Sequence, residues 1–106
     1  MSLSMTSDAQ FTQDVLTSDT PVLVDFTADW CPPCRMVEPV LEQIASDQAG
    51  RLKVVSIDVD ANPATTARYG VMSMPTLALF VDGEVVTQSV GARPRAMIMR
   101  DLEPHL

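Results

Sequence analysis

The sequence predicts a single α/β domain with a central mixed β-sheet of four to five strands and helices on both of its faces. Three patterns lead to this prediction. Residues 22–27 form a near-continuous apolar run, typical of a strand that is buried on both sides. A helical pattern and a second strand pattern at residues 52–59 follow it, as in a βαβ unit with parallel strands. Near the C-terminus, Asp82-Gly83 separates two further strand patterns and predicts an antiparallel hairpin.

Before the run at 22–27, the sequence predicts one strand and one helix. Residues 3–6 have the weak pattern of an edge strand. Ser7 and Gln10 match a capping box, with Ser7 as the N-cap residue, and apolar residues then recur on one helical face. An amphipathic helix is therefore expected over residues 8–17.

A longer helix is expected between the two parallel strands, starting at the first cysteine and ending near Gly50. We expect Pro39 to remove one backbone hydrogen bond and kink this helix rather than end it, because the apolar period resumes beyond it. After the second strand, Asn62 as N-cap and Pro63 at the first helical position predict a short helix that runs toward Gly70.

The C-terminal third changes to antiparallel pairing. Strands are expected at residues 76–81 and 84–90, and a glycine ends the hairpin. Pro94 then begins a final helix, in which Ile98 and Leu102 are spaced to pack on the sheet.

Length and composition describe one globular domain over residues 1–106. Hydrophobic residues make up 46% of the chain and charged residues 20%, which is ordinary for such a domain. Fourteen acidic against seven basic residues give a formal net charge of −7, which repels nucleic-acid phosphates and anionic lipid. No nucleic-acid or membrane partner is therefore expected.

The N-terminal sequence indicates the cellular compartment in which the protein is expected. Residues 1–6 lack the basic and apolar regions of a leader, and no apolar run reaches membrane length. We therefore expect a cytoplasmic location, where a cysteine pair is more often catalytic than structural. No pattern predicts self-association, so the expected state is a monomer.

The only two cysteines of the chain, Cys31 and Cys34, lie three residues apart. At this spacing they come face to face in the first turn of a helix, so a disulfide can form and break with little backbone movement. With Cys31 as N-cap, Pro32 and Pro33 fall at the first two helical positions, whose N–H groups have no partner inside a helix. The pair is therefore interpreted as a redox switch.

Cys31 is the predicted nucleophile of the pair. Its sulfur would face the positive end of the helix dipole and accept a hydrogen bond from the N–H of Cys34. Both effects favour the thiolate, which is the species that attacks disulfides. Cys34, one turn deeper, is then the resolving thiol.

Two other uses of a C-x-x-C motif are weaker. A zinc site needs two more ligands, and the chain offers only His105 at its extreme C-terminus. A permanent structural disulfide would close a short loop and stabilise the fold little. No metal is therefore expected.

Asp25 interrupts the apolar strand at residues 22–27. A charged, unpaired carboxylate in that position is costly, so we expect a raised pKa and a largely neutral acid. Such a group could exchange a proton with Cys34. Alternatively, Asp25 turns toward a solvated edge or caps a backbone group.

Beyond these local patterns, the chain resembles the thioredoxin family along essentially its whole length. The shared segments are Val-Asp-Phe-x-Ala, Trp-Cys-x-Pro-Cys, a proline five residues after Cys34, Asp-Val-Asp-Ala-Asn-Pro, Met-Pro-Thr, the Asp-Gly-Glu hairpin and Val-Gly-Ala before the last helix. This set, in the right order, is far more specific than C-x-x-C alone. It implies a thioredoxin fold.

The resemblance implies a protein disulfide reductase without a bound cofactor. Cys31 would attack the disulfide of a client protein and Cys34 would resolve the mixed disulfide, with Asp25 as the buried proton donor and acceptor. Reducing equivalents would come from NADPH through a thioredoxin reductase. Pro75 matches the family's cis-proline, which would lie opposite the cysteines.

The resemblance also implies a client-binding surface, a flat apolar collar around the cysteines. Its members would be Trp30, Met74, Pro75, Gly91 and Ala92. The backbone of Met74 would hydrogen-bond to an extended client segment, as in strand addition.

Three positions depart from the usual family pattern. Pro32 stands where most thioredoxins have glycine, and with Pro33 it forms the dipeptide that tunes redox potential in the superfamily. Thr27 replaces a tryptophan, which removes bulk from beneath the active-site turn. Ser56 matches a lysine that commonly pairs with the buried acid, and without that cation desolvation should raise the pKa of Asp25 further.

Two other functions remain open. The Pro-Pro turn could make the disulfide less stable, which would give a thiol oxidant or isomerase with a shifted redox potential. Alternatively, the chain is a thioredoxin-fold binding subunit whose partner recognises the apolar collar and needs no redox turnover. A Cys31→Ser variant that kept the biological role would favour the binding subunit.

Overall fold

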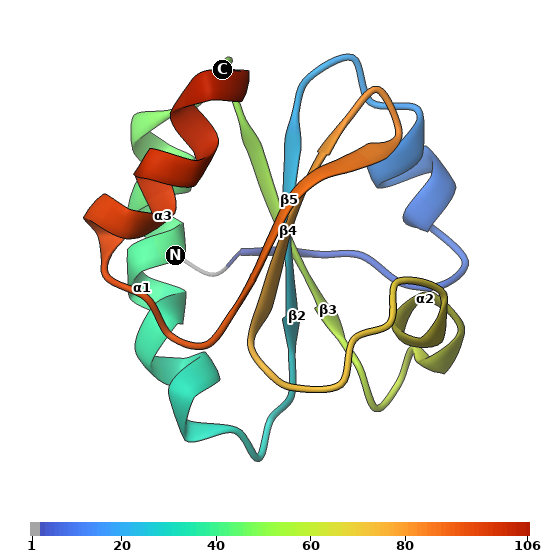
Figure 1. The fold of residues 1–106 in the computed structure, drawn as a ribbon. Coiled ribbons are helices and arrows are strands. Elements are labelled where there is room, and N and C mark those ends of the chain that lie inside the picture. The colour runs from blue at the N-terminus through green and yellow to red at the C-terminus, as the bar shows by residue number, and fades with distance from the viewer. Residues whose placement is uncertain (1–2) are drawn as a thin grey trace.

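The computed structural model describes residues 3–106, which form one five-stranded sheet with helices on both faces (Figure 1). Residues 1 and 2, which the single-domain prediction included, lie outside the described part. The strands are β1 (Ser4–Met5), β2 (Val22–Thr27), β3 (Lys53–Asp58), β4 (Thr76–Val81) and β5 (Glu84–Val90). The helices are η1 (Thr12–Leu16), α1 (Pro32–Asp47), α2 (Pro63–Arg68), α3 (Arg95–Leu102) and η2 (Glu103–His105).

The strand order β1-β3-β2-β4-β5 places β2 at the centre of the sheet. β2 pairs in parallel with β3 and antiparallel with β4, so the sheet is mixed, as predicted. β4 and β5 pair antiparallel through Asp82 and Gly83, whose φ values of 52° and 81° are the positive values that a two-residue hairpin turn needs. The βαβ unit and the hairpin are confirmed.

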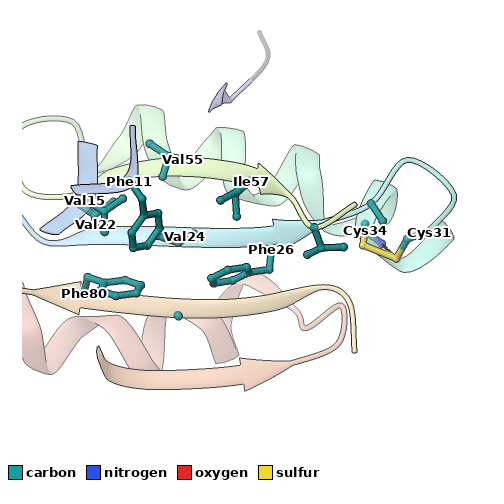
Figure 2. Packing of buried hydrophobic residues seen from close by; sticks show 13 residues of the cluster. Phe11, Val15, Val22, Val24, Phe26, Cys31, Cys34, Val55, Ile57 and Phe80 are labelled. Atoms are coloured by element: carbon teal, nitrogen blue, oxygen red, sulfur yellow. Dashed lines mark hydrogen bonds between the residues drawn. A yellow bond between two sulfur atoms is a disulfide. The ribbon is translucent and has the colours of Figure 1, made fainter. Parts of the chain in front are cut away.

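Each face of the sheet has its own apolar core, because side chains alternate along the strands. α1 and α3 cover one face, whereas α2 and η1 lie on the other (Figure 1). On the side of η1, Val24 and Phe26 of β2 pack with Phe11 and Phe80 (Figure 2). On the opposite face, Leu23 belongs to the cluster formed with α1 and α3.

The first helix begins later than the sequence predicts. A helix was expected over residues 8–17, but residues 8–10 form turns and η1 is a five-residue π-helix. Half of the capping box is present, since the hydroxyl of Ser7 accepts the N–H of Gln10 at 3.2 Å. The start of the predicted helix is wrong because Asp8 is bound to another element.

Asp8 caps α2 instead. Its carboxylate accepts the N–H groups of Ala64 and Thr65 at 3.2 and 2.9 Å, and its own N–H donates to Oδ1 of Asn62 at 2.8 Å. Hydrogen bonding from Thr65 lowers the pKa of Asp8. Asn62 is the N-cap residue of α2 by position, as predicted, but its side chain makes no cap bond and donates to the carbonyl of Asp58.

α1 continues through Pro39 to Asp47, as the resumed apolar pattern predicts. It ends in a C-cap at Gln48, two residues before the predicted stop at Gly50. Within residues 3–106, no helix has both the length and the apolar character that a membrane crossing requires.

Candidate active site

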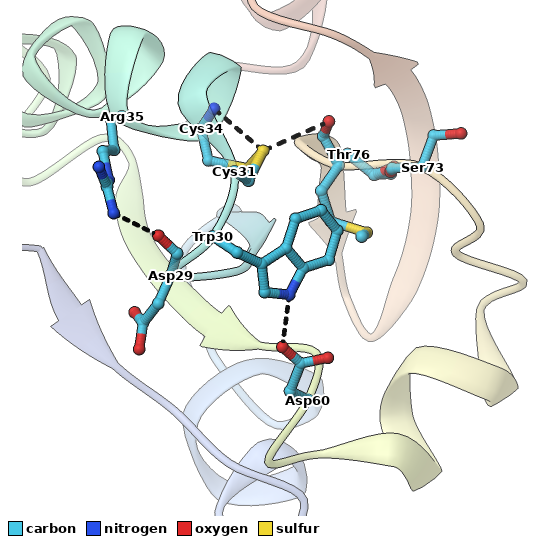
Figure 3. Close-up of a disulfide and its surroundings, with 9 residues drawn as sticks. Asp29, Trp30, Cys31, Cys34, Arg35, Asp60, Ser73 and Thr76 are labelled. Carbon is cyan, nitrogen blue, oxygen red and sulfur yellow. Dashed lines mark hydrogen bonds between the residues drawn. A yellow bond between two sulfur atoms is a disulfide. The ribbon is translucent and has the colours of Figure 1, made fainter.

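The cysteine pair lies at the N-terminus of α1, where the sequence places it. Cys31 is the N-cap residue, and Pro32 and Pro33 occupy the first two helical positions. The backbone N–H of Cys34 points at the Cys31 sulfur, 3.3 Å away (Figure 3). The positive end of the helix dipole and this N–H both favour a thiolate at Cys31 in the reduced protein.

In the structure, Cys31 and Cys34 are joined by a disulfide with their Cα atoms 5.3 Å apart. Both residues are buried, with exposed fractions of 3% and 2%. They differ in position rather than in exposure. The Cys31 sulfur lies 3.7 Å from the carbonyl oxygen of Met74, whereas Cys34 lies one turn further into α1. Within residues 3–106, no group of three or more His, Cys, Asp and Glu side chains is arranged to hold a metal ion.

The peptide bond between Met74 and Pro75 is cis and directly precedes β4. Thr76, the first residue of β4, pairs with Phe26 near the end of β2. Because these strands are antiparallel, the start of β4 and the end of β2 lie at the same edge of the sheet. The N–H of Gly91 donates to the Pro75 carbonyl at 2.8 Å and holds the end of β5 at that edge. The sheet therefore brings Pro75 and Gly91 to the cysteines.

Apolar side chains are exposed next to the disulfide in sequence and in the segments that contain Pro75 and Gly91. Trp30 is 62% exposed, and its indole N–H donates to a carboxylate oxygen of Asp60 at 2.7 Å (Figure 3). Met72 is 91% exposed and Ala92 is also exposed, whereas Met74 is partly buried against the core. Exposed large apolar side chains that gather at one place are typical of a contact surface.

Asp25 is 2% exposed in the central strand, and no hydrogen bond reaches its Oδ1. Desolvation, with a smaller contribution from the Glu38 carboxylate, raises the pKa of Asp25 from 3.8 to about 7. Ser56 is its neighbour on β3, but the Ser56 hydroxyl donates to the sulfur of Met5 at 2.9 Å. The raised pKa is as expected, and the alternative of a solvated Asp25 is wrong.

A cavity of about 430 Å³ opens between the start of α1 and the carboxyl ends of β2 and β3. Thr27 and Ser56 form part of its wall, and both lie on the sheet face to which Asp25 belongs. Glu38 and Arg35 of α1 line the opposite side. Space beneath the active-site turn is what the small side chain of Thr27 was expected to leave.

Sequence reasoning did not single out Glu38 or Asp60. A signal existed for Glu38, because it follows Cys34 by four residues and so shares its side of the helix. The hydrogen bond between Asp60 and Trp30 joins residues 30 positions apart and has no local signature.

Known proteins match the chain over most of its length. The thioredoxin family model matches residues 2–104. Over 100 residues, the chain is 49% identical to thioredoxin 1 of Nostoc sp., with 94% of each chain covered. Over 96 residues, it is 53% identical to the thioredoxin of Mycobacterium bovis, covering 91% of this chain and 83% of the relative. It is also 52% identical over 96 residues to a bifunctional thioredoxin reductase/thioredoxin of Mycobacterium leprae, covering 91% of this chain and 21% of that protein.

Proposed function

The chain belongs to the thioredoxin family and is a thiol–disulfide reductase, and we propose that Cys31 is its attacking sulfur and Cys34 its resolving sulfur. One observation carries this assignment of roles. At the N-terminus of α1, the Cys31 sulfur receives the N–H of Cys34 and faces the helix dipole. These groups stabilise a thiolate at Cys31 rather than at Cys34.

The proposed reaction has two exchanges. The Cys31 thiolate attacks one sulfur of a client disulfide, and the other client sulfur leaves as a thiolate that takes a proton from solvent. Cys34 then loses its proton and attacks the Cys31 sulfur, which forms the intramolecular disulfide and releases the second client thiolate. The second client thiolate also takes a proton from solvent, so the client gains two electrons and two protons. The cysteine pair loses two electrons, the proton of Cys34 and the proton that Cys31 gave to solvent when its thiolate formed.

Asp25 is proposed as the base that takes the proton of Cys34. A pKa of about 7 allows its carboxyl group to accept and return a proton near neutral pH. The unpartnered Oδ1 supports this role, because no other hydrogen bond has to be broken when the proton arrives.

Client binding is assigned to the apolar surface beside the disulfide, made up of Trp30, Met74, Pro75, Gly91 and Ala92. The backbone of Met74 lies next to the Cys31 sulfur, where an extended client segment could pair with it. The exposed indole of Trp30 offers apolar area and is held in place by Asp60.

A thioredoxin reductase that uses NADPH is the proposed source of reducing equivalents, and no cofactor bound to this chain is needed. The Mycobacterium leprae relative, named a bifunctional thioredoxin reductase/thioredoxin, supports a reductase partner. We place the protein in the cytoplasm as a monomer, since a reducing compartment keeps such a pair available as the dithiol.

Trapping of the mixed disulfide tests the two roles. Cys34→Ser protein incubated with native insulin, whose disulfides are intact, should accumulate an adduct on Cys31, because the resolving sulfur is absent. Cys31→Ser protein should form little adduct, since Cys34 lies one turn further into α1 and its sulfur lacks the N–H that stabilises a thiolate at Cys31. Mass spectrometry of non-reduced samples, with a dithiothreitol-treated control, counts the adducts. Equal rates of adduct formation in the two variants would overturn the assignment.

A further inference from the structure

The cavity beneath the active-site turn carries an excess of negative charge. Carboxylates of Asp29, Glu38 and Asp58 line it together with one cation, the guanidinium of Arg35. That cation is already engaged, since it donates to the backbone carbonyl of Asp29 at 2.6 Å. No ion pair within residues 3–106 includes any of the three carboxylates.

A buried acceptor without a donor lies behind this wall. The side chain of Asp25 belongs to the same sheet face as Thr27 and Ser56, two residues that line the cavity, and its Oδ1 is unpartnered. Ser56 does not supply the missing donor, because its hydroxyl bonds to Met5. An unpartnered buried polar atom calls for an explanation, and a donor that enters through the cavity provides one.

The rest of the wall combines apolar and hydroxyl side chains, and the cavity is roomy. Leu3, Met5 and Ala28 contribute apolar surface. The volume of about 430 Å³ is many times the roughly 30 Å³ that a water molecule occupies in the liquid. Apolar side chains that share a cavity with carboxylates suit a side chain with an aliphatic stem and a cationic head, as in lysine and arginine.

The cavity also lies close to the reacting sulfurs. Asp29 precedes the C-x-x-C segment and Arg35 follows it directly. Both lie on the opposite side of the disulfide from Thr76 (Figure 3). A client that pairs with Met74 and crosses the active-site turn therefore arrives at the cavity within a few residues.

We propose that this acidic cavity is a client-specificity site, which accepts a lysine or arginine side chain located near the disulfide to be reduced. The inference rests on the proposed reduction of client proteins. The stem of the client side chain packs on Leu3 and Met5, and its cationic head pairs with Glu38 and Asp58 and points toward Asp25. Clients with a basic residue at the right spacing are then reduced faster than neutral counterparts.

A lysine scan of a disulfide peptide tests this site. Disulfide-linked dimers of one short cysteine peptide carry lysine at one position at a time, and the matched peptides carry glutamine there. The reduced protein is mixed with excess peptide, and Trp30 fluorescence gives the second-order rate constant. We expect a lysine-to-glutamine rate ratio of about five to ten at a small number of positions. At the other positions the ratio should be lower and uniform, because there the lysine is favoured only by long-range attraction to the net charge of −7. This uniform value is the background ratio.

Variants separate the cavity from the overall charge. Glu38→Gln should lower the favoured ratio about threefold, whereas Glu84→Gln makes the same charge change on the exposed β5 and should leave it unchanged. Thr27→Trp fills the cavity but keeps every charge, so it should reduce the favoured ratio to background. If Thr27→Trp does not fold, the comparison of Glu38→Gln with Glu84→Gln still tests whether the cavity selects the lysine peptides.

Two results would overturn the specificity site. One is a lysine-to-glutamine ratio that is the same at all positions, and the other is an equal loss in Glu38→Gln and Glu84→Gln. Either would leave only long-range attraction by the net charge. Failure of the reductase function looks different, because then the glutamine peptides would not be reduced either.

Discussion

Asp25 couples the stability of the fold to its chemistry through one side chain. Asp25 is buried, Ser56 bonds to Met5 instead, and Glu38 adds a second negative charge. These surroundings make the carboxylate costly in the native state, and they also prepare the acid to exchange a proton at neutral pH.

Asp25→Asn should remove a pH dependence of the free energy of unfolding. The pKa of Asp25 is about 7 in the native state against an ordinary 3.8, so between these values only the native state keeps the proton. The free energy of unfolding then falls as pH rises from about 4 to about 7, by at most about 4 kcal/mol at about 1.4 kcal/mol per pH unit. Urea unfolding of the disulfide form across this range measures the slope.

The matched control for this slope is Asp19→Asn, which makes the same exchange at an exposed position. It should unfold with the slope of the unmodified protein, whereas Asp25→Asn should be flatter. An unchanged slope in Asp25→Asn would contradict the raised pKa.

The same Asp25→Asn variant should change the pH profile of disulfide reduction. If Asp25 takes the proton of Cys34, the rate of resolution rises as pH increases through about 7, where the carboxylate forms. Without this base, we expect resolution at neutral pH to slow by at least about tenfold and the rise near pH 7 to disappear. Rapid-mixing measurement of Trp30 fluorescence gives the profile, and a profile unchanged by the substitution would exclude Asp25 as the base.

Among the elements, the β4–β5 turn depends on one glycine for two separate reasons. Gly83 has a φ of 81°, and a Cβ added there would meet the backbone oxygen of Leu16 at 2.9 Å. The turn is therefore packed against the end of η1 as well as shaped for the hairpin. A side chain at this position disturbs both elements at once.

Gly83→Ala should destabilise the protein more than Gly50→Ala. Both positions have positive φ, 81° and 90°, which costs a non-glycine residue about 1–2 kcal/mol, but Gly50 has nothing within 4 Å of an added Cβ. The close approach to Leu16 should add about 1 kcal/mol or more at Gly83. Urea unfolding measures both variants, and equal losses would show that the contact with Leu16 has no energetic effect.

The strands were predictable from the sequence because their signals are local. The apolar run of β2, the Asp82-Gly83 turn and the start of α1 directly after Cys31 each depend on neighbouring residues. The start of the first helix could not be predicted in this way, since the carboxylate of Asp8 binds backbone groups 56 and 57 residues away. The hydrogen bond from Trp30 to Asp60 could not be predicted for the same reason, because it joins residues that are distant in the sequence.

At the scale of the whole molecule, the order of the strands assembles the site. The central β2 ends at Thr27, just before the segment that carries the cysteines, and the antiparallel β4 begins directly after Pro75 on the same edge of the sheet. The residue types of this site were predictable from the family resemblance. The acidic cavity was not, because it depends on Thr27, Glu38 and Asp58 from three segments that meet only in the folded chain.

The equilibrium reduction potential of the Cys31–Cys34 pair distinguishes a reductase from an oxidant. Trp30, the only tryptophan of the chain, adjoins Cys31, so its fluorescence in dithiol buffers follows the pair while mass spectrometry counts free thiols. From family membership we predict a midpoint near the value of about −270 mV known for thioredoxin itself. A midpoint of about −180 to −120 mV, typical of isomerising and oxidising proteins, would contradict the reductase function. Pro32 would then be the first residue to replace with glycine.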